Sequence, residues 1–135
     1  MKNNRFGQAK VLDTNELDLI IKYLPSNYHK MLALTLRSSG ARIGEVVQLR
    51  WRDVGKEQIL FPATITKRKL KSREIFISNS FYKSLMDFKL DWTIYKGRKP
   101  TPEDYVFYGR KEGSHLSTRA FMLALDKALE RAKII

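Results

Sequence analysis

The sequence predicts an α+β domain that is mainly helical and carries a small antiparallel β-sheet. Several segments place apolar residues at helical spacing, and one stretch between them, residues 57–78, is rich in β-branched and aromatic residues. No internal repeat and no low-complexity block interrupts this order. A chain of 135 residues suits one domain with a hydrophobic core of its own.

The amino-terminal part is predicted to contain an arm and a first helix. Residues 1–12 are polar and basic without periodicity, so we expect a basic arm or linker, and we expect residues 13–135 to form the domain. Asp13 is the predicted cap of the first helix, with Glu16 three positions later as in a capping box. Apolar residues follow at helical spacing: Leu17, Ile20, Ile21 and Leu24. Pro25 is expected to end this helix.

Two further helices are predicted before the sheet. The first, residues 27–38, is apolar on several sides, which indicates that it crosses the core. Gly40 is expected to close it, because glycine readily adopts the left-handed conformation found at helix ends. A short helix over residues 43–49 follows.

The sheet is predicted as a single hairpin. "EQILFPATIT", residues 57–66, and "REIFIS", residues 73–78, have strand composition, and the basic tract of residues 67–72 between them forms the turn. Pro62 has no N–H to donate, so it either restricts the first strand to a sheet edge or marks a bulge.

The carboxyl-terminal half is predicted to hold two longer helices. Asn79 and Ser80 are the cap candidates for the first, which ends near Tyr95, and "YVFY", residues 105–108, is predicted as a short strand. Ser117 is expected to cap the last helix. The apolar residues of that helix form one stripe at i, i+4 spacing: Ala120, Phe121, Ala124, Leu125, Ala128, Leu129 and Ala132.

The charge of the chain indicates the class of its partner. There are 26 Lys and Arg residues against 14 Asp and Glu, which gives a formal net charge of +12. A polyanion is the natural partner of so basic a domain, and double-stranded DNA is our first candidate. Basicity alone is weak evidence, because ribosomal and membrane-surface proteins share it.

Several other classes of site lack their residues. The chain has no cysteine, so neither disulfides nor thiolate metal sites are available. His29 and His115 stand far apart without ligand-spaced carboxylates, so we predict no metal site. "SSGARIGE" lacks the Gly-Lys-Ser/Thr of a phosphate-binding loop, and we predict no cofactor and no small-molecule ligand. No apolar run approaches the ~20 residues of a membrane span. We therefore expect a soluble cytoplasmic protein without membrane contact that associates with the nucleoid when it is on DNA.

Arg42 is the first candidate site residue. If a helix ran through it, Arg42 would lie on the same apolar arc as Val46 and Leu49, one turn from Glu45, so we expect it to be partly buried and held in place. A guanidinium paired with a carboxylate is preorganised, and its planar donors match phosphate oxygens. The alternative is that Arg42 and Glu45 form only a structural ion pair.

The turn of the hairpin is the second candidate. "TKRKLKSR", residues 66–73, holds five basic residues and no acid, namely Lys67, Arg68, Lys69, Lys71 and Arg73. On a hairpin this tract could follow DNA phosphates or enter a groove. The alternative is that the charges only protect a sheet edge from aggregation.

"SGARIGEVVQLRWRDV" resembles the first conserved box of the tyrosine recombinases, the phage integrase family, in which a Gly-x-Arg-x-x-Glu helix leads to Leu-x-Trp-x-Asp. The context agrees, since a capped helix precedes the box and a lysine hairpin, a long helix, "VFY" and an "LS"-initiated helix follow it. The likeness extends from Lys10 onward and implies a partial integrase-like catalytic domain.

The resemblance implies roles for matching residues. Arg42 would be the first catalytic arginine, which binds a non-bridging oxygen of the scissile phosphate, and Glu45 would orient it. The family's hairpin lysine, which protonates the leaving 5′-oxygen, falls on Lys69, with Lys67 as the alternate. Arg68, Lys71 and Arg73, together with Lys67, are expected to contact DNA.

Other family motifs are not matched in this sequence. The His-x-x-Arg box and the tyrosine that forms the 3′-phosphotyrosyl intermediate have no counterpart, because His115 and Arg119 have the wrong spacing. We therefore expect an amino-terminal, truncated part of a catalytic domain, which binds DNA but does not recombine it. We also expect self-association through the stripe of the last helix and the apolar helix of residues 27–38, left exposed.

Two other functions remain open at this stage. One is a non-enzymatic DNA-binding or nucleoprotein interaction module with the same fold. The other is a basic structural protein, for example a ribosome-associated one, in which Arg42 only stabilises the fold.

Overall fold

The structure is a computed structural model that describes residues 14–24, 26–65 and 72–132. Its elements, in chain order, are α2 (Thr14–Ile21), α3 (Asn27–Ser39), α4 (Ile43–Val46), the 3₁₀ turn η1 (Trp51–Asp53), β1 (Gln58–Phe61), the 3₁₀ turn η2 (Ala63–Ile65), β2 (Arg73–Phe76), α5 (Asn79–Lys96) and α6 (Thr118–Ala132). The predicted fold class is confirmed: the chain is mainly helical, and its sheet has two antiparallel strands.

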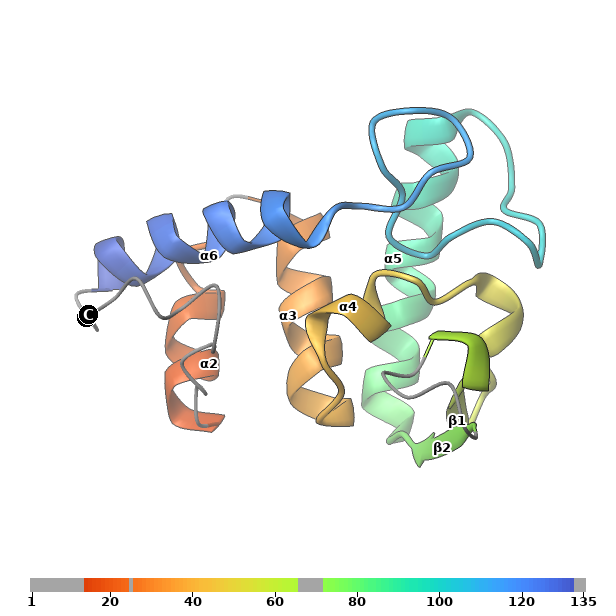
Figure 1. Ribbon diagram of the computed structural model, residues 1–135, viewed down its shortest axis with the longest axis horizontal. Coiled ribbons are helices and arrows are strands. Elements are labelled where there is room, and N and C mark those ends of the chain that lie inside the picture. The colour runs from red at the N-terminus through yellow and green to blue at the C-terminus, as the bar shows by residue number, and fades with distance from the viewer. Residues whose placement is uncertain (1–13, 25, 66–71, 133–135) are drawn as a thin grey trace.

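The helices pack around α3. Helix α3 contacts α2 on one side and α5 on the other, α4 packs against it, and α6 runs across the ends of α2 and α3 (Figure 1). Met31, Leu32 and Ala33 of α3 are buried, so the prediction that this helix crosses the core is confirmed. No helix in the described ranges is long and apolar enough to span a membrane.

Local capping sets the ends of α3 close to the predicted residues. The Ser26 hydroxyl accepts a hydrogen bond from the backbone N–H of His29 at 3.3 Å. At the other end Gly40 has φ 68°, and its N–H donates to the carbonyl of Leu36 at 2.9 Å. Both groups satisfy backbone atoms that a helix end otherwise leaves without a partner.

Helix α2 is shorter than predicted, since it ends at Ile21 rather than beside Pro25. Residues 22–24 instead form a tight turn, in which each N–H donates to the carbonyl three residues back, and the Leu24 side chain stays buried. A residue before proline is disfavoured in the α conformation, so the helix does not continue through Leu24. The predicted Asp13 cap and the predicted arm, residues 1–12, lie outside the described residues.

Helix α4 is also shorter than predicted and ends at Val46 instead of Leu49. After it the backbone binds a distant segment: the N–H of Val106 donates to Leu49, and the N–H of Trp51 donates to Asp104, at 3.0 and 2.9 Å. Between these points the N–H groups of Gln48 and Leu49 donate to carbonyls three residues back, so the chain leaves the helix through a tight turn.

The predicted hairpin is confirmed by the pairing of β1 with β2. Ile59 lies opposite Ile75 and Phe61 lies opposite Arg73, in antiparallel register. The first strand ends at Phe61, earlier than predicted, because Pro62 begins the turn η2, in which the N–H of Ile65 donates to the Pro62 carbonyl. Pro62 thus ends the strand.

Helix α5 has a different cap from the two predicted candidates. Ser78, not Asn79 or Ser80, accepts the N–H of Phe81 on its hydroxyl at 3.1 Å. The predicted strand at residues 105–108 is wrong as well: this stretch, all of it described, makes only isolated bridges, from Tyr105 to Arg50 and from Tyr108 to His115. Tyr105 and Tyr108 each make one bridge, with different partners, so the stretch between them forms no continuous strand pairing.

Helix α6 begins as predicted, with the Ser117 hydroxyl accepting the N–H of Ala120 at 3.0 Å. Its stripe, however, is not left exposed. Phe121, Leu125, Ala128 and Leu129 are buried, and α6 packs against α2. The predicted exposure of this stripe and of helix α3 is therefore wrong, because α2 packs against α6, and α2, α4 and α5 pack against α3.

Candidate nucleic-acid interface

The loop between α3 and α4 places Arg42 at a helix start. The Ser39 hydroxyl accepts the N–H of Ala41 at 3.1 Å, and Arg42 follows with extended backbone angles, φ −81° and ψ 152°. Arg42 is thus the N-cap residue, one position before α4, and its side chain is exposed. The prediction of a partly buried Arg42 is wrong, because a residue outside the helix does not share the angular position that helical spacing assigns to it.

Glu45 occupies the interior position instead. Its carboxylate is only 6% exposed, and Oε1 accepts the backbone N–H of Arg42 at 3.1 Å. The same oxygen forms an ion pair with Nη2 of Arg73 at 3.0 Å. Within the described part of the chain, the guanidinium of Arg42 donates to no acceptor, so Glu45 holds the backbone of Arg42 rather than its side chain.

Arg73 connects this helix start to the hairpin. It is the first residue of β2, and its guanidinium lies over the ring of Phe61, the cross-strand neighbour, with 5.0 Å between Cζ and the ring centroid. The hairpin base and the start of α4 are therefore joined through one carboxylate. Sequence reasoning assigned Arg73 to DNA and missed this pairing, since nothing in the spacing relates residues 45 and 73.

The remaining basic residues of the hairpin lie outside the described residues. Lys67, Arg68, Lys69 and Lys71 belong to the undescribed stretch 66–71. The structure describes the chain on both sides of them, up to Ile65 in η2 and again from Ser72 before β2. Their predicted contacts with DNA, and the choice between Lys69 and Lys67 as proton donor, remain predictions.

A polar hollow of about 210 Å³ lies between η2 and the segment that follows α4. Arg50 lines it, and its guanidinium lies 4.3 Å from the ring centroid of Tyr105 and donates to the Tyr105 hydroxyl at 2.8 Å. It also donates to the carbonyl of Glu103 at 2.7 Å. These contacts span more than fifty residues, so no local pattern could have revealed them.

Asp53 lies beneath Arg50 and ends the Leu-x-Trp-x-Asp motif. Its side chain is buried and accepts the backbone N–H of Arg50 at 2.9 Å. Burial raises the pKa of Asp53, and the Arg50 N–H and the nearby charges of Arg52 and Arg50 oppose that rise. The acid therefore caps the turn η1, and its geometry is structural.

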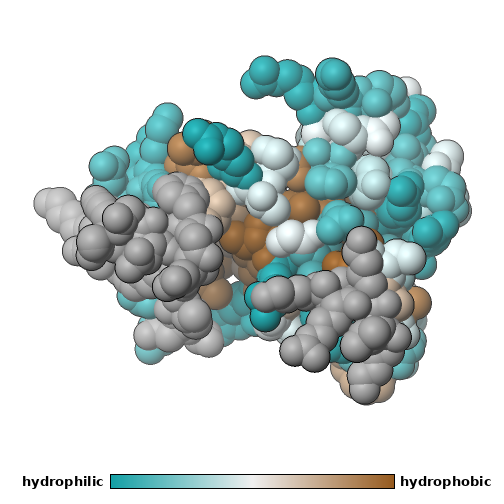
Figure 2. All heavy atoms as spheres, in the orientation of Figure 1, coloured by the Kyte–Doolittle hydropathy of each residue, from teal (hydrophilic) through white to brown (hydrophobic). Residues whose placement is uncertain are grey.

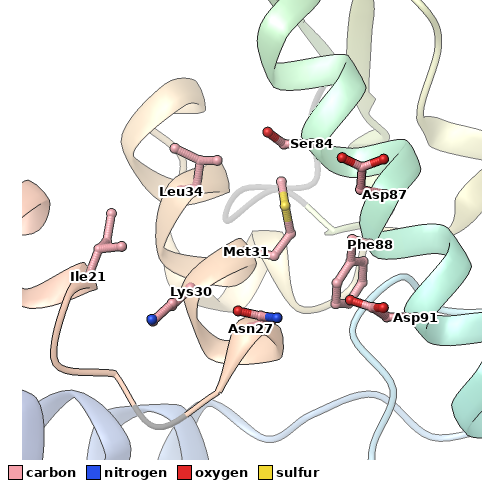
Figure 3. A pocket seen from close by; sticks show the side chains of 9 residues that line it. All are labelled: Ile21, Asn27, Lys30, Met31, Leu34, Ser84, Asp87, Phe88 and Asp91. Atoms are coloured by element: carbon pink, nitrogen blue, oxygen red, sulfur yellow. The ribbon is translucent and has the colours of Figure 1, made fainter.

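A second hollow lies on the surface between α3 and α5 (Figure 3), with a volume of about 310 Å³. Apolar side chains such as Met31 and Phe88 form its floor, and Asp87 and Asp91 of α5 stand along one wall. Lys30 also lines the hollow, but two carboxylates one turn apart outweigh its single charge and repel a polyanion. This groove is therefore a poor site for DNA.

The face shown in Figure 2 combines polar and apolar surface. Hydrophilic side chains surround an apolar area near its centre, over α3 and α4. No group of three or more His, Cys, Asp or Glu side chains among the described residues could hold a metal ion.

Known proteins resemble this chain in sequence and in fold. The model of the phage integrase family matches residues 10–135. Transposase A from transposon Tn554 of Staphylococcus aureus strain Mu50 is 32% identical over 127 residues, which cover 88% of this chain and 34% of the transposase. The same transposase from strain N315 gives the same values. This chain thus spans about a third (34%) of the length of these curated relatives.

A solved structure supports the same grouping at the level of fold. The crystal structure of XerA recombinase superposes with a TM-score of 0.68 at 18% sequence identity, over 97% of this chain and 49% of that one. Because the family model matches nearly the whole sequence, the chain belongs to the phage integrase family, the tyrosine recombinases.

Proposed function

We propose that this chain binds double-stranded DNA through Arg42 and the basic hairpin, as part of a recombinase that cuts and rejoins DNA. One observation carries the proposal. The carboxylate of Glu45 binds both the Arg42 backbone and Arg73, so the start of α4 lies beside the base of the hairpin. The exposed Arg42 guanidinium, which has no acceptor among the described residues, and a tract of four further cations would then be available to one phosphate backbone.

The proposed chemistry follows from charge and geometry. The Arg42 guanidinium would bind non-bridging oxygens of the scissile phosphate and stabilise the charge that develops there. Glu45 has no proton-transfer role in this scheme, because it is committed to the Arg42 N–H and to Arg73. Lys69, or Lys67 as the alternate, would protonate the 5′-oxygen that leaves when a tyrosine attacks phosphorus.

The DNA-binding part of the proposal is tested by salt dependence. Affinity for a duplex should fall steeply with salt, with a slope of log K against log salt of about −0.9 for each phosphate neutralised. Replacing Lys67, Arg68, Lys69 and Lys71 by Gln should flatten that slope. A matched variant that removes four cations elsewhere, at Lys22, Lys30, Lys83 and Lys99, should leave it nearly unchanged. Salt-insensitive binding, or equal effects of the two variants, would refute the proposed interface.

The catalytic part requires a recombination-competent protein that contains these residues. Lys69→Ala and Lys67→Ala are compared on a DNA substrate and on one with a 5′-thio leaving group, which needs no proton donor. The thio substrate should rescue the variant that lacks the true general acid and should leave the other unaffected. If neither variant is rescued, the proton donor is not on this hairpin.

Self-association is a further proposal, now on different residues from those first expected. The largest apolar exposure among the described residues lies at Ile94 of α5 and Phe76 of β2, which are 80% and 76% exposed. Exposed apolar side chains favour association where they belong to a contiguous patch. Sedimentation at rising concentration tests this, and a monomer at all concentrations would exclude it.

A further inference from the structure

Arg73 is held on two sides by its own fold. Its guanidinium covers the ring of Phe61 at 5.0 Å and pairs with Glu45 at 3.0 Å. Stacking on an aromatic face and pairing with a carboxylate both use the planar shape of the guanidinium. The side chain is nevertheless 42% exposed, so its burial alone does not decide whether it also meets DNA.

The partner of Arg73 is unsuited to a phosphate contact at the same place. Glu45 carries a negative charge 3.0 Å from the Arg73 guanidinium, and a phosphate that approached Arg73 would be repelled by that charge. Arg42 differs, because among the described residues its side chain has no acceptor and only its backbone N–H binds Glu45. The Arg73 guanidinium is thus paired with Glu45, whereas the Arg42 guanidinium has no acceptor among the described residues and could bind a phosphate.

The shared oxygen of Glu45 also keeps the Arg42 backbone and the Arg73 guanidinium close together. Oε1 of Glu45 lies 3.1 Å from the Arg42 nitrogen and 3.0 Å from Nη2 of Arg73. Because the carboxylate is buried, it cannot follow either group into solvent without exposing the interior around it. The start of β2 is therefore anchored to the N-cap of α4, and in the sequence residues 66–71 precede this strand by one residue, Ser72.

We propose that Arg73 is a positioning residue, which acts through Glu45 to hold the start of β2 at the N-cap of α4, beside Arg42, and does not itself bind a DNA phosphate. The inference rests on the proposed function, since it concerns how two parts of the same interface are aligned. It replaces the sequence-based expectation that Arg73 contacts DNA.

A set of variants in the full chain separates the two roles. Duplex affinity and its salt slope are measured for Arg73→Gln, Glu45→Gln and the double variant. If Arg73 acts through Glu45, Arg73→Gln weakens binding in the natural background but adds nothing to Glu45→Gln. In the Glu45→Gln background the salt slope also stays the same. If Arg73 binds a phosphate, its loss lowers the magnitude of the slope by about 0.9 in both backgrounds, which would overturn the inference.

Two further measurements keep the test decisive. Arg37→Gln is the matched control, because Arg37 is also a partly exposed arginine in an ion pair, with Asp18, but on α3; it should change affinity little. If Arg73→Gln alone does not fold, the comparison of Glu45→Gln with the double variant still decides, since both lack the buried charge. If the natural chain shows no salt-dependent binding, the proposed function fails, whereas normal binding with equal slope losses refutes only the role of Arg73.

Discussion

The carboxylate of Glu45 and the guanidinium of Arg73 form an ion pair at 3.0 Å across 28 positions of sequence, one partner buried and the other partly exposed. This pair joins the Gly-x-Arg-x-x-Glu box around Arg42 to the hairpin that follows it. Because the two partners differ in burial, removing either one has a different consequence for stability.

Arg73→Ala should destabilise the chain more than Glu45→Gln does. The first change leaves the Glu45 carboxylate charged in a buried place without this guanidinium, at a cost of about 2 kcal/mol. The second removes the buried charge, keeps an acceptor for the Arg42 N–H, and leaves an arginine that can turn to solvent, so about 1 kcal/mol is expected. Urea unfolding of both variants measures the difference, and a larger loss for Glu45→Gln would contradict it.

Arg42→Ala should leave stability almost unchanged while it weakens DNA binding. The side chain is exposed and binds no described residue, so the free energy of unfolding should change by less than about 0.5 kcal/mol. Thermal unfolding and duplex titration at fixed salt are compared on the same preparation. A variant that loses stability but not affinity would favour the alternative of a basic structural protein.

Trp51→Phe should cost less stability than Trp92→Phe. Both tryptophans are buried, but Nε1 of Trp51 has no acceptor among the described residues, whereas Nε1 of Trp92 donates to the carbonyl of Tyr105 at 3.1 Å. Phenylalanine removes an unsatisfied donor at the first position and leaves an unsatisfied carbonyl at the second, a difference of about 1–3 kcal/mol. Equal losses in denaturant titrations would show that Trp51 has an acceptor after all.

The chain should lose stability as the pH falls below about 6.5, the ordinary pKa of histidine. Burial lowers the pKa of His29, whose ring stacks on Phe121 and lies 2.8 Å from the Ser26 hydroxyl. The unfolded chain then binds more protons than the folded chain just below that pH, so stability rises with pH in this window. His29→Gln should reduce this dependence, as unfolding at a series of pH values will test.

Local chemistry determined much of this fold from the sequence alone. Ser26 and Gly40 mark the ends of α3, Ser117 starts α6, and the change to β-branched residues marks the hairpin. Each signal acts through bonds within a few residues, so neighbours in sequence suffice to decide it. The charge of +12 and the box around Arg42 likewise indicate a polyanionic partner and the phage integrase family, and neither signal depends on the tertiary structure.

Contacts between distant residues were decided only by the tertiary structure. The segment that binds Leu49 and Trp51 from residues 104 and 106 ends α4 early, and it makes bridges instead of the expected strand at 105–108. Helical periodicity put Arg42 inside, whereas the fold puts Arg42 outside and gives the interior to Glu45, which Arg73 then pairs. The physical reason is that helical periodicity predicts the orientation of a residue only while that residue is inside the helix. The partner of a buried charge depends on which distant strand packs beside it, and spacing within one element carries no information about that.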